Sequence, residues 1–202
     1  MGGSGRKVAG CVPTRPVASS AVAEPVAGAS ARPCDRYEVL LVRSKYDPRV
    51  WLFPKGGVKR KESPKEAAVR ETREEAGVEG TVLAKLGTWR PWSGEQHTMF
   101  LMLVELERRP GDPLWQESRE RPRRWFSFAD AERQLEATRG KRPELLDMLR
   151  TARKALADYE EEQARAREKE QKKLLKREQK RLGKLVEAAL ADTCDDPGCT
   201  ST

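Results

Sequence analysis

The chain has 202 residues and a net charge of +8, with 40 lysines and arginines against 32 aspartates and glutamates. That length suits one compact domain with extensions better than two full domains. The basic balance favours polyanionic partners such as nucleotides, polyphosphates, nucleic acid or anionic lipid. A single histidine and four cysteines, none in a Cys-x-x-Cys pair, argue against a zinc site.

No apolar run reaches the roughly 18 residues of a membrane-spanning helix. The segment from Met1 to Lys7 also lacks the apolar stretch of a secretory signal. We therefore expect a protein of the cytoplasm and/or the nucleus, with reduced thiols and no membrane partner.

The first third of the chain alternates short apolar runs with turn-forming residues. Lys7–Val12 predicts a strand, and the Ala-, Ser- and Pro-rich stretch over 14–36 predicts an insertion or a mobile loop. Tyr37–Val42 predicts a second strand. Val50–Phe53 is another short apolar run, ended by a Pro-Lys-Gly-Gly turn.

Clear helix signals follow this turn. Ser63 is a candidate N-cap, Pro64 fits the first helical position, and Glu66 three residues after the serine completes a capping box. Gly77 fits the position just past the helix end. The signals predict a helix over Pro64–Ala76. Its buried face would be narrow and made of small residues, namely Ala68, Thr72 and Ala76, with Val69 beside them.

The remaining elements mix both periodicities. Thr81–Leu86, His97–Leu106 and Trp125–Phe128 predict strands, and Ala129–Glu136 and Arg142–Leu156 predict helices. Intermixed strands and helices indicate an α/β (α+β) fold with a mixed sheet.

The C-terminal part of the chain differs in composition. We expect a folded domain over 1–156, a charged extended helix over 157–191 and a disordered tail over 192–202. Glutamate–arginine and glutamate–lysine pairs four residues apart support the helix. Its leucines do not sustain a heptad repeat, so the pattern predicts neither a coiled coil nor an apolar docking face, and the protein is expected to be a monomer.

The chemistry is concentrated between Gly56 and Val78. On a helix, Glu71, Glu74 and Glu75 fall within an arc of about 100°. Three carboxylates so close repel one another unless a cation lies among them, and Mg²⁺ prefers oxygen ligands. Arg70, four residues before Glu74, can hold a carboxylate in position. Arg-Glu and Glu-Glu pairs alone are equally typical of an exposed charged helix.

The full spacing is much more specific. The stretch resembles the Nudix box, G-x5-E-x7-R-E-U-x-E-E-x-G-U with U apolar, and departs from it only by Thr72 at the first U. The matching residues are Gly56, Glu62, Arg70, Glu71, Glu74, Glu75, Gly77 and Val78. The chain is therefore identified as a member of the Nudix hydrolase superfamily.

Flanking motifs extend the resemblance over most of residues 7–152. Within the superfamily they are similar to those of the diphosphoinositol polyphosphate and diadenosine polyphosphate hydrolases. They comprise Val8–Pro13, the W-x-x-P-K-G-G run Trp51–Gly57, Gln96–His97, and a W-x-E-x3-R-x-R-x-W-F pattern from Trp115 to Phe126.

The resemblance implies a Nudix-type mixed sheet sandwiched between helices, and a role for each box residue. Glu71 and Glu75 would bind the metal, Mg²⁺ or alternatively Mn²⁺, with the Lys55 carbonyl as a further protein ligand. Glu74 would act as general base or share the metal site. Arg70 would orient the glutamates, and Glu62 would tie the loop to the helix.

The implied substrate is a polyphosphorylated small molecule, held by basic and polar side chains. The candidates are Lys7, Ser44, Lys45, Lys55, Lys59, Arg60, Lys61, His97, Arg121 and Arg123. Three tryptophans either stack on a base or serve as core and loop anchors: Trp89, Trp92 and Trp115.

Three functions remain open at this point. The first is metal-dependent hydrolysis of phosphoanhydride bonds in diphosphoinositol polyphosphates and/or diadenosine polyphosphates. The second is the same chemistry on capped RNA or another nucleotide, with nucleic acid the less favoured partner because the C-terminal helix carries many glutamates. The third is an inactive Nudix-fold binding protein.

Overall fold

The computed structural model describes residues 5–17, 33–137, 140 and 142–192. The chain forms two units, one ending at Tyr159 and the other beginning at Glu160. The first contains all the strands and the helices α1 (Pro64–Ala76) and α2 (Phe128–Glu136). The long helix α3 (Glu144–Asp192) begins in the first unit and continues into the second. No described helix is both long and apolar enough to span a bilayer.

The strands of the first unit form one mixed sheet. Neighbours follow the order β3-β2-β1-β6-β5, while β4 adds to β1 and β7 adds to β2. β1 and β6 are parallel, and the other pairings are antiparallel. The expected α+β class with a mixed sheet is therefore confirmed. The strands are β1 (Lys7–Pro16), β2 (Tyr37–Arg43), β3 (Trp51–Leu52), β4 (Lys55–Gly57), β5 (Val78–Trp89), β6 (Gln96–Glu107) and β7 (Arg123–Ser127).

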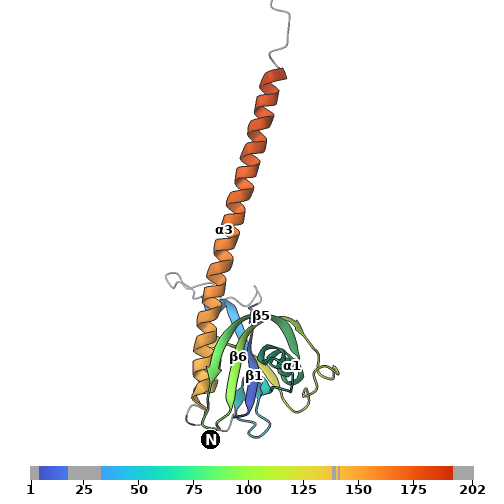
Figure 1. Ribbon diagram of the computed structural model, residues 1–202, viewed down its shortest axis with the longest axis vertical. Coiled ribbons are helices and arrows are strands. Elements are labelled where there is room, and N and C mark those ends of the chain that lie inside the picture. Colours follow the sequence, from blue (N-terminus) through green and yellow to red (C-terminus); the bar gives the residue numbers. More distant parts are fainter. Residues whose placement is uncertain (1–4, 18–32, 138–139, 141, 193–202) are drawn as a thin grey trace, which may run out of the picture. The chain divides into compact units, whose positions relative to one another are not determined.

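Helices cover both faces of the sheet centre, so β6 is apolar on both sides. Its residues alternate: Met99 and Leu101 belong to the core cluster that includes residues 145–156 of α3, whereas Phe100 and Met102 belong to the cluster under α1. Figure 1 shows α1 and the start of α3 on opposite sides of β1 and β6. This layering explains why the strand reads as a continuous apolar run.

Helix α1 lies on the sheet through the small face that its sequence predicts. Ala67, Ala68, Thr72 and Ala76 are all fully buried, and Thr72 therefore fills an apolar position despite its hydroxyl. The cysteine beneath this helix, Cys11, is also fully buried, and burial raises the pKa of its thiol to about 12.

The proposed insertion begins later than the sequence indicates. Thr14–Pro16 were expected in the loop over 14–36, but they continue β1 and pair with residues 37–39 of β2. The Thr14 hydroxyl donates to the Met102 carbonyl, which anchors this extension to β6. Pro33–Arg36 form a short 3-10 helix. Residues 18–32 lie outside the described part of the chain.

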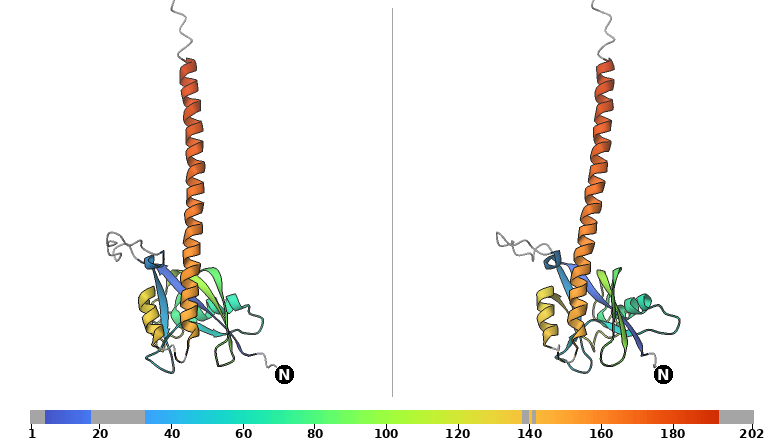
Figure 2. Two further views of the ribbon diagram at one scale, coloured as in Figure 1. Left: turned by 90° about the vertical axis from the view of Figure 1, so that its left-hand side faces the viewer. Right: turned by 60° about the vertical axis from the view of Figure 1, so that its left-hand side comes forward.

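Two boundaries near the end of the first unit also differ from expectation. Phe128 was placed in a strand, but it opens α2 because the Ser127 side chain accepts a hydrogen bond from the Asp130 amide and caps the helix. Figure 2 shows α2 beside β2, on which it packs. The helices expected over 142–156 and 157–191 are one helix, α3, which passes through Gly183 without a break. The expected tail lies outside the described residues from 193 onward.

Candidate active site

Helix α1 begins and ends where its capping residues predict. The Ser63 side chain accepts from the Glu66 amide, the Glu66 carboxylate accepts from the Ser63 amide, and Pro64 occupies the first turn. Gly77 has a left-handed φ of 61° and donates its amide to the Arg73 carbonyl. Local capping residues thus mark both ends of the helix that carries the glutamates.

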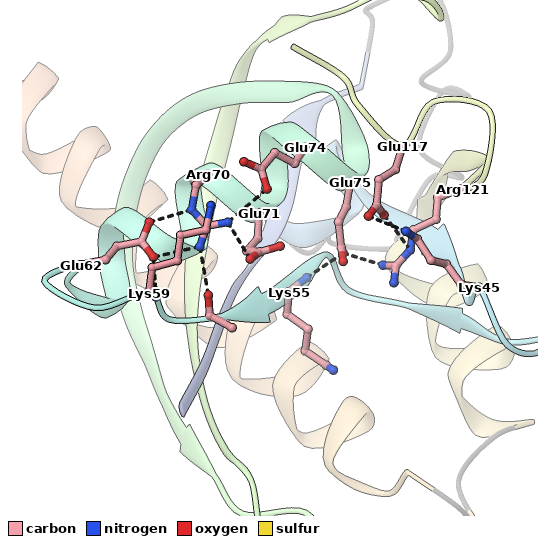
Figure 3. A network of polar contacts seen from close by, with 11 residues as sticks. Lys45, Lys55, Lys59, Glu62, Arg70, Glu71, Glu74, Glu75, Glu117 and Arg121 are labelled. Carbon is pink, nitrogen blue, oxygen red and sulfur yellow. Dashed lines mark hydrogen bonds and ion pairs between the residues drawn. The ribbon is translucent and has the colours of Figure 1, made fainter. Parts of the chain in front are cut away.

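Arg70 is the centre of the polar network on this helix (Figure 3). Its guanidinium donates to both carboxylate oxygens of Glu62 at 2.7 and 2.8 Å, and to the Gly57 carbonyl at 3.0 Å. The Nη1 atom also donates to Glu71 at 2.7 Å and to Glu74 at 3.1 Å. Its hydrogen bonds lower the pKa of Glu62 to about 2 and keep that carboxylate charged. One arginine therefore joins the preceding loop to two of the three glutamates.

The two glycines expected in a turn belong instead to strand β4, where they pair with β1 and leave space for a carboxylate. A Cβ atom at Gly56 would lie 2.2 Å from the carboxyl carbon of Glu71, so any side chain there would displace this carboxylate. A Cβ at Gly57 would meet only the end of the flexible Arg6 side chain, at 3.1 Å. Gly56 alone is thus required for Glu71 to lie against β4.

Glu75 lies outside the Arg70 network and is more deeply buried than the other two glutamates. Its side chain is 7% exposed, accepts from the Lys55 amide at 3.0 Å and pairs with Arg121 at 2.6 Å. Burial raises the pKa of Glu75 to about 7, although the charge of Arg121 and the Lys55 amide act in the opposite direction. The Lys55 ammonium points away from the three glutamates (Figure 3), and burial lowers its pKa.

The ion pair at Glu75 continues into a chain of alternating charges. Arg121 lies 3.1 Å from Glu117, and Lys45 lies 2.6 Å from Glu117 and 2.9 Å from Glu120. The hydrogen bond to Glu117 raises the pKa of Lys45. Lys45 and Arg121, both predicted substrate ligands, are thus paired with glutamates, and a polyanionic substrate would have to compete with these carboxylates for them.

The segment before β7 caps the C-terminal end of α1. The last carbonyls of a helix lack partners within it. Here the Glu117 amide donates to the Glu74 carbonyl at 3.0 Å, and the Trp115 indole donates to the Glu75 carbonyl at 3.1 Å. Arg123 donates to the carbonyls of residues 76 and 77, and its guanidinium stacks on Trp115 at 4.1 Å.

This cap changes how the W-x-E-x3-R-x-R pattern is interpreted. Trp115 is 4% exposed and is an anchor of the loop, which favours the second of the two roles open to it. The Arg123 guanidinium donates hydrogen bonds to backbone carbonyls. Its role in binding substrate therefore stays a prediction. The capping role was missed because nothing in the spacing of the pattern relates it to a helix that ends about 40 residues earlier.

The other predicted substrate residues fall into two groups. Ser44 is buried, and its hydroxyl accepts from the amides of residues 46 and 47 in a turn. His97 is 1% exposed, pairs with Glu95 at 3.1 Å, and has a pKa lowered chiefly by burial. The cationic side chains that remain open to solvent are Lys7, Lys59, Arg60 and Lys61. The sequence did not single out two acids, the half-buried Glu95 and the buried Glu144, whose charges act on the lysine at 55 and on His97. In the sequence, Glu144 is visible only as an acid in the first turn of a helix.

The three glutamates offer oxygen ligands, the type that a hard divalent cation prefers. Glu71, Glu74 and Glu75 supply carboxylate oxygens on one helix, and each of the three is paired with a guanidinium group. Within the described residues, no three acidic, histidine or cysteine side chains surround one point as ligands would. The physical reason is that Arg70 holds Glu71 and Glu74 while Arg121 holds Glu75. The predicted metal roles remain predictions.

The class of this domain is defined by a mixed sheet with a Gly-Gly pair in β4 and by an acidic helix held by one arginine. The family model described as "NUDIX domain" matches residues 25–149, more than half of the chain. The chain belongs to the NUDIX family.

Several proteins of similar sequence are named as Nudix hydrolases or as phosphohydrolases. Nudix hydrolase 4 of Arabidopsis thaliana is 40% identical over 134 residues, which are 62% of this chain and 57% of that protein. Diphosphoinositol polyphosphate phosphohydrolase 3-alpha of Mus musculus is 35% identical over 115 residues, covering 56% and 69%. The chain spans only about half the length of two Arabidopsis relatives that it matches, at 57% and 48%. A solved structure of an ADP compounds hydrolase, 20% identical, aligns with 76% of this chain and 74% of its own at a TM-score of 0.52, which shows the shared fold.

Removing the charge of Glu62 should lower stability in a pH-dependent way. Because the fold depresses its pKa, the stabilisation is present above the unfolded value of about 4.3 and is lost as pH falls toward about 2. Glu62→Gln should therefore cost about 2 kcal/mol at pH 7, and the cost should shrink below pH 4. Urea unfolding at pH 7 and pH 3 measures both. Glu161→Gln, in an exposed pair, is the control with little effect at either pH.

The cradle at Gly56 makes a second prediction. Gly56→Ala should displace the Glu71 carboxylate and weaken Mg²⁺ or Mn²⁺ binding at least about tenfold, the scale of disturbed ligand positioning. Gly57→Ala, next in the chain but clear of the carboxylate, should bind like the parent. Calorimetric titration with each metal gives the affinities. Equal affinities for the two variants would show that Glu71 is not a ligand at this position.

Proposed function

We propose that this protein is a metal-dependent pyrophosphohydrolase that cleaves phosphoanhydride bonds in highly phosphorylated small molecules. The observation that carries the proposal is the Arg70 network, which brings together Glu74 and Glu71, the latter beside Gly56. Such clustering of carboxylates costs free energy on a bare helix and is useful where a divalent cation binds. Membership in the NUDIX family supports the same chemistry.

The residues would divide the work according to their exposure. Glu74 is the most open of the three, at 20% against 14% for Glu71 and 7% for Glu75, so it has the best access to an attacking water as general base. Glu71 and Glu75, against β4, would hold the metal together with the Lys55 carbonyl. Bound Mg²⁺, or Mn²⁺, would lower the pKa of that water and neutralise charge on the phosphates.

The substrate class follows from the exposed cations and from the relatives. Lys59, Arg60 and Lys61 lie in the loop leading into α1 and are open to solvent, in the part of the chain that the structure describes. A polyanion with more charge than a simple nucleotide gains most from such a cluster. Diphosphoinositol polyphosphates and/or diadenosine polyphosphates are therefore the proposed substrates, and the similarity to a diphosphoinositol polyphosphate phosphohydrolase supports the former.

The metal ligands can be tested by a matched pair of substitutions. Glu75→Gln should lower kcat at least about a hundredfold, the loss typical of electrostatic catalytic groups. Glu66→Gln on the same helix should retain activity, because glutamine also completes a capping box. Phosphate release at saturating Mg²⁺ compares the two. A Glu75→Gln protein with near-normal turnover would contradict the assignment.

The substrate class can be tested by a panel assay. The parent should have a higher kcat/KM for a diphosphoinositol polyphosphate or a long diadenosine polyphosphate than for a nucleoside triphosphate or capped RNA. Replacing Lys59, Arg60 and Lys61 with glutamine should raise KM for the polyanions about tenfold or more, at about 0.5 kcal/mol or more for each exposed charge, with little change in kcat. Glutamine at the exposed Lys85, Arg90 and Arg109 is the control with the same charge change. A preference for capped RNA or for a nucleoside triphosphate would defeat the proposal.

A further inference from the structure

The second unit carries an unexpected set of exposed apolar side chains. Five large aliphatic residues between 172 and 186 are each 54–64% exposed: Leu174, Leu175, Leu182, Leu185 and Val186. Elsewhere in the described residues, exposed large apolar side chains occur singly. A group of aliphatic side chains left in water on one short helical segment indicates a contact surface.

These aliphatic residues share one face of the helix. At about 100° per residue they fall within an arc of about 120°. Every lysine and arginine from Lys172 to Lys184 falls on the rest of the circumference, whereas Glu178, the single acid of the segment, falls within the aliphatic arc. We call residues 172–186 the basic amphipathic segment. The expectation that this helix lacks an apolar face was based on a heptad template, which asks for a narrow seam, whereas this arc follows the 3.6-residue period.

The length of the apolar arc helps to decide which class of partner it can bind. In the preceding turns Glu160, Ala164, Arg167 and Gln171 stand on the same side, so the apolar arc begins at Leu174. The segment is about 20 Å long. A coiled coil with a second copy needs apolar positions over at least three or four heptads. A nucleic acid would use the cations but leave the aliphatic side chains in water.

We propose that the basic amphipathic segment binds the surface of an anionic lipid bilayer. The aliphatic arc would lie at the boundary between headgroups and acyl chains, as in other helices of this composition. The lysines and arginines on either side would extend their charged ends to the headgroups. Charge complementarity favours anionic lipid, since juxtamembrane cations contribute about 1 kcal/mol each at such a surface. This proposal replaces the expectation of no membrane partner and is independent of the catalytic proposal.

The experiment is co-sedimentation of the full chain with vesicles of phosphatidylcholine alone or mixed with phosphatidylserine. The parent should bind the mixed vesicles at least about tenfold better than the neutral ones, and added salt should weaken binding. Gln at Leu175, Leu182 and Val186 should reduce binding at least about tenfold, because three aliphatic side chains leave the bilayer. Gln at Lys173, Lys180 and Lys184 should reduce it on the order of a hundredfold, about 1 kcal/mol per lysine.

A matched control keeps the outcome interpretable. Gln at the exposed Ala164 and Ala166, on the same helix before the segment, should bind like the parent. Circular dichroism must show equal helix content for all variants, and solution mass must be unchanged. Three results would overturn the proposal: no binding to mixed vesicles, binding that the aliphatic substitutions leave intact, or a dimer that these substitutions dissociate. Binding to RNA that depends on the lysines but not on the aliphatic residues would assign the surface to nucleic acid instead.

Discussion

The arrangement of the candidate site depends on one guanidinium group. Arg70 contacts the loop through Glu62 and the Gly57 carbonyl, and the helix through Glu71 and Glu74. Without it, three carboxylates and a carbonyl would lie close together with little water to screen them, and repulsion would open the loop. Because Arg70 is only 13% exposed, solvent screens these contacts less than it screens a surface ion pair.

A second set of contacts fixes the other end of the same helix. Glu117, Trp115 and Arg123 satisfy the carbonyls of residues 74–77, so a distant segment ends α1 and also supplies the charges around Glu75. Movement of this segment would alter the helix end and the Glu75 position together. The glutamates thus lie on a helix fixed at its start by its own loop and at its end by the chain before β7.

Helix α3 serves two purposes along its length. Residues 145–156 bury a stripe of leucine, methionine and alanine in the core of the first unit. The aliphatic side chains between 174 and 186 remain exposed in the second unit and are surrounded by cations. The same residue types therefore stabilise the fold in one stretch and remain exposed in the other, and the charge pattern of the neighbouring residues distinguishes the two.

The sequence alone determined the elements whose signals are local. The caps at Ser63 and Gly77, the small face of α1 and the spacing of the glutamates depend on residues within a few turns of one another. Tertiary structure decided what lies between distant segments: the pairing of Glu75 with Arg121, the capping of α1 by Trp115 and Arg123, and the extension of β1 to Pro16. These contacts join residues 21 to 46 positions apart, and only the closure of the chain around a shared core brings them within hydrogen-bonding distance.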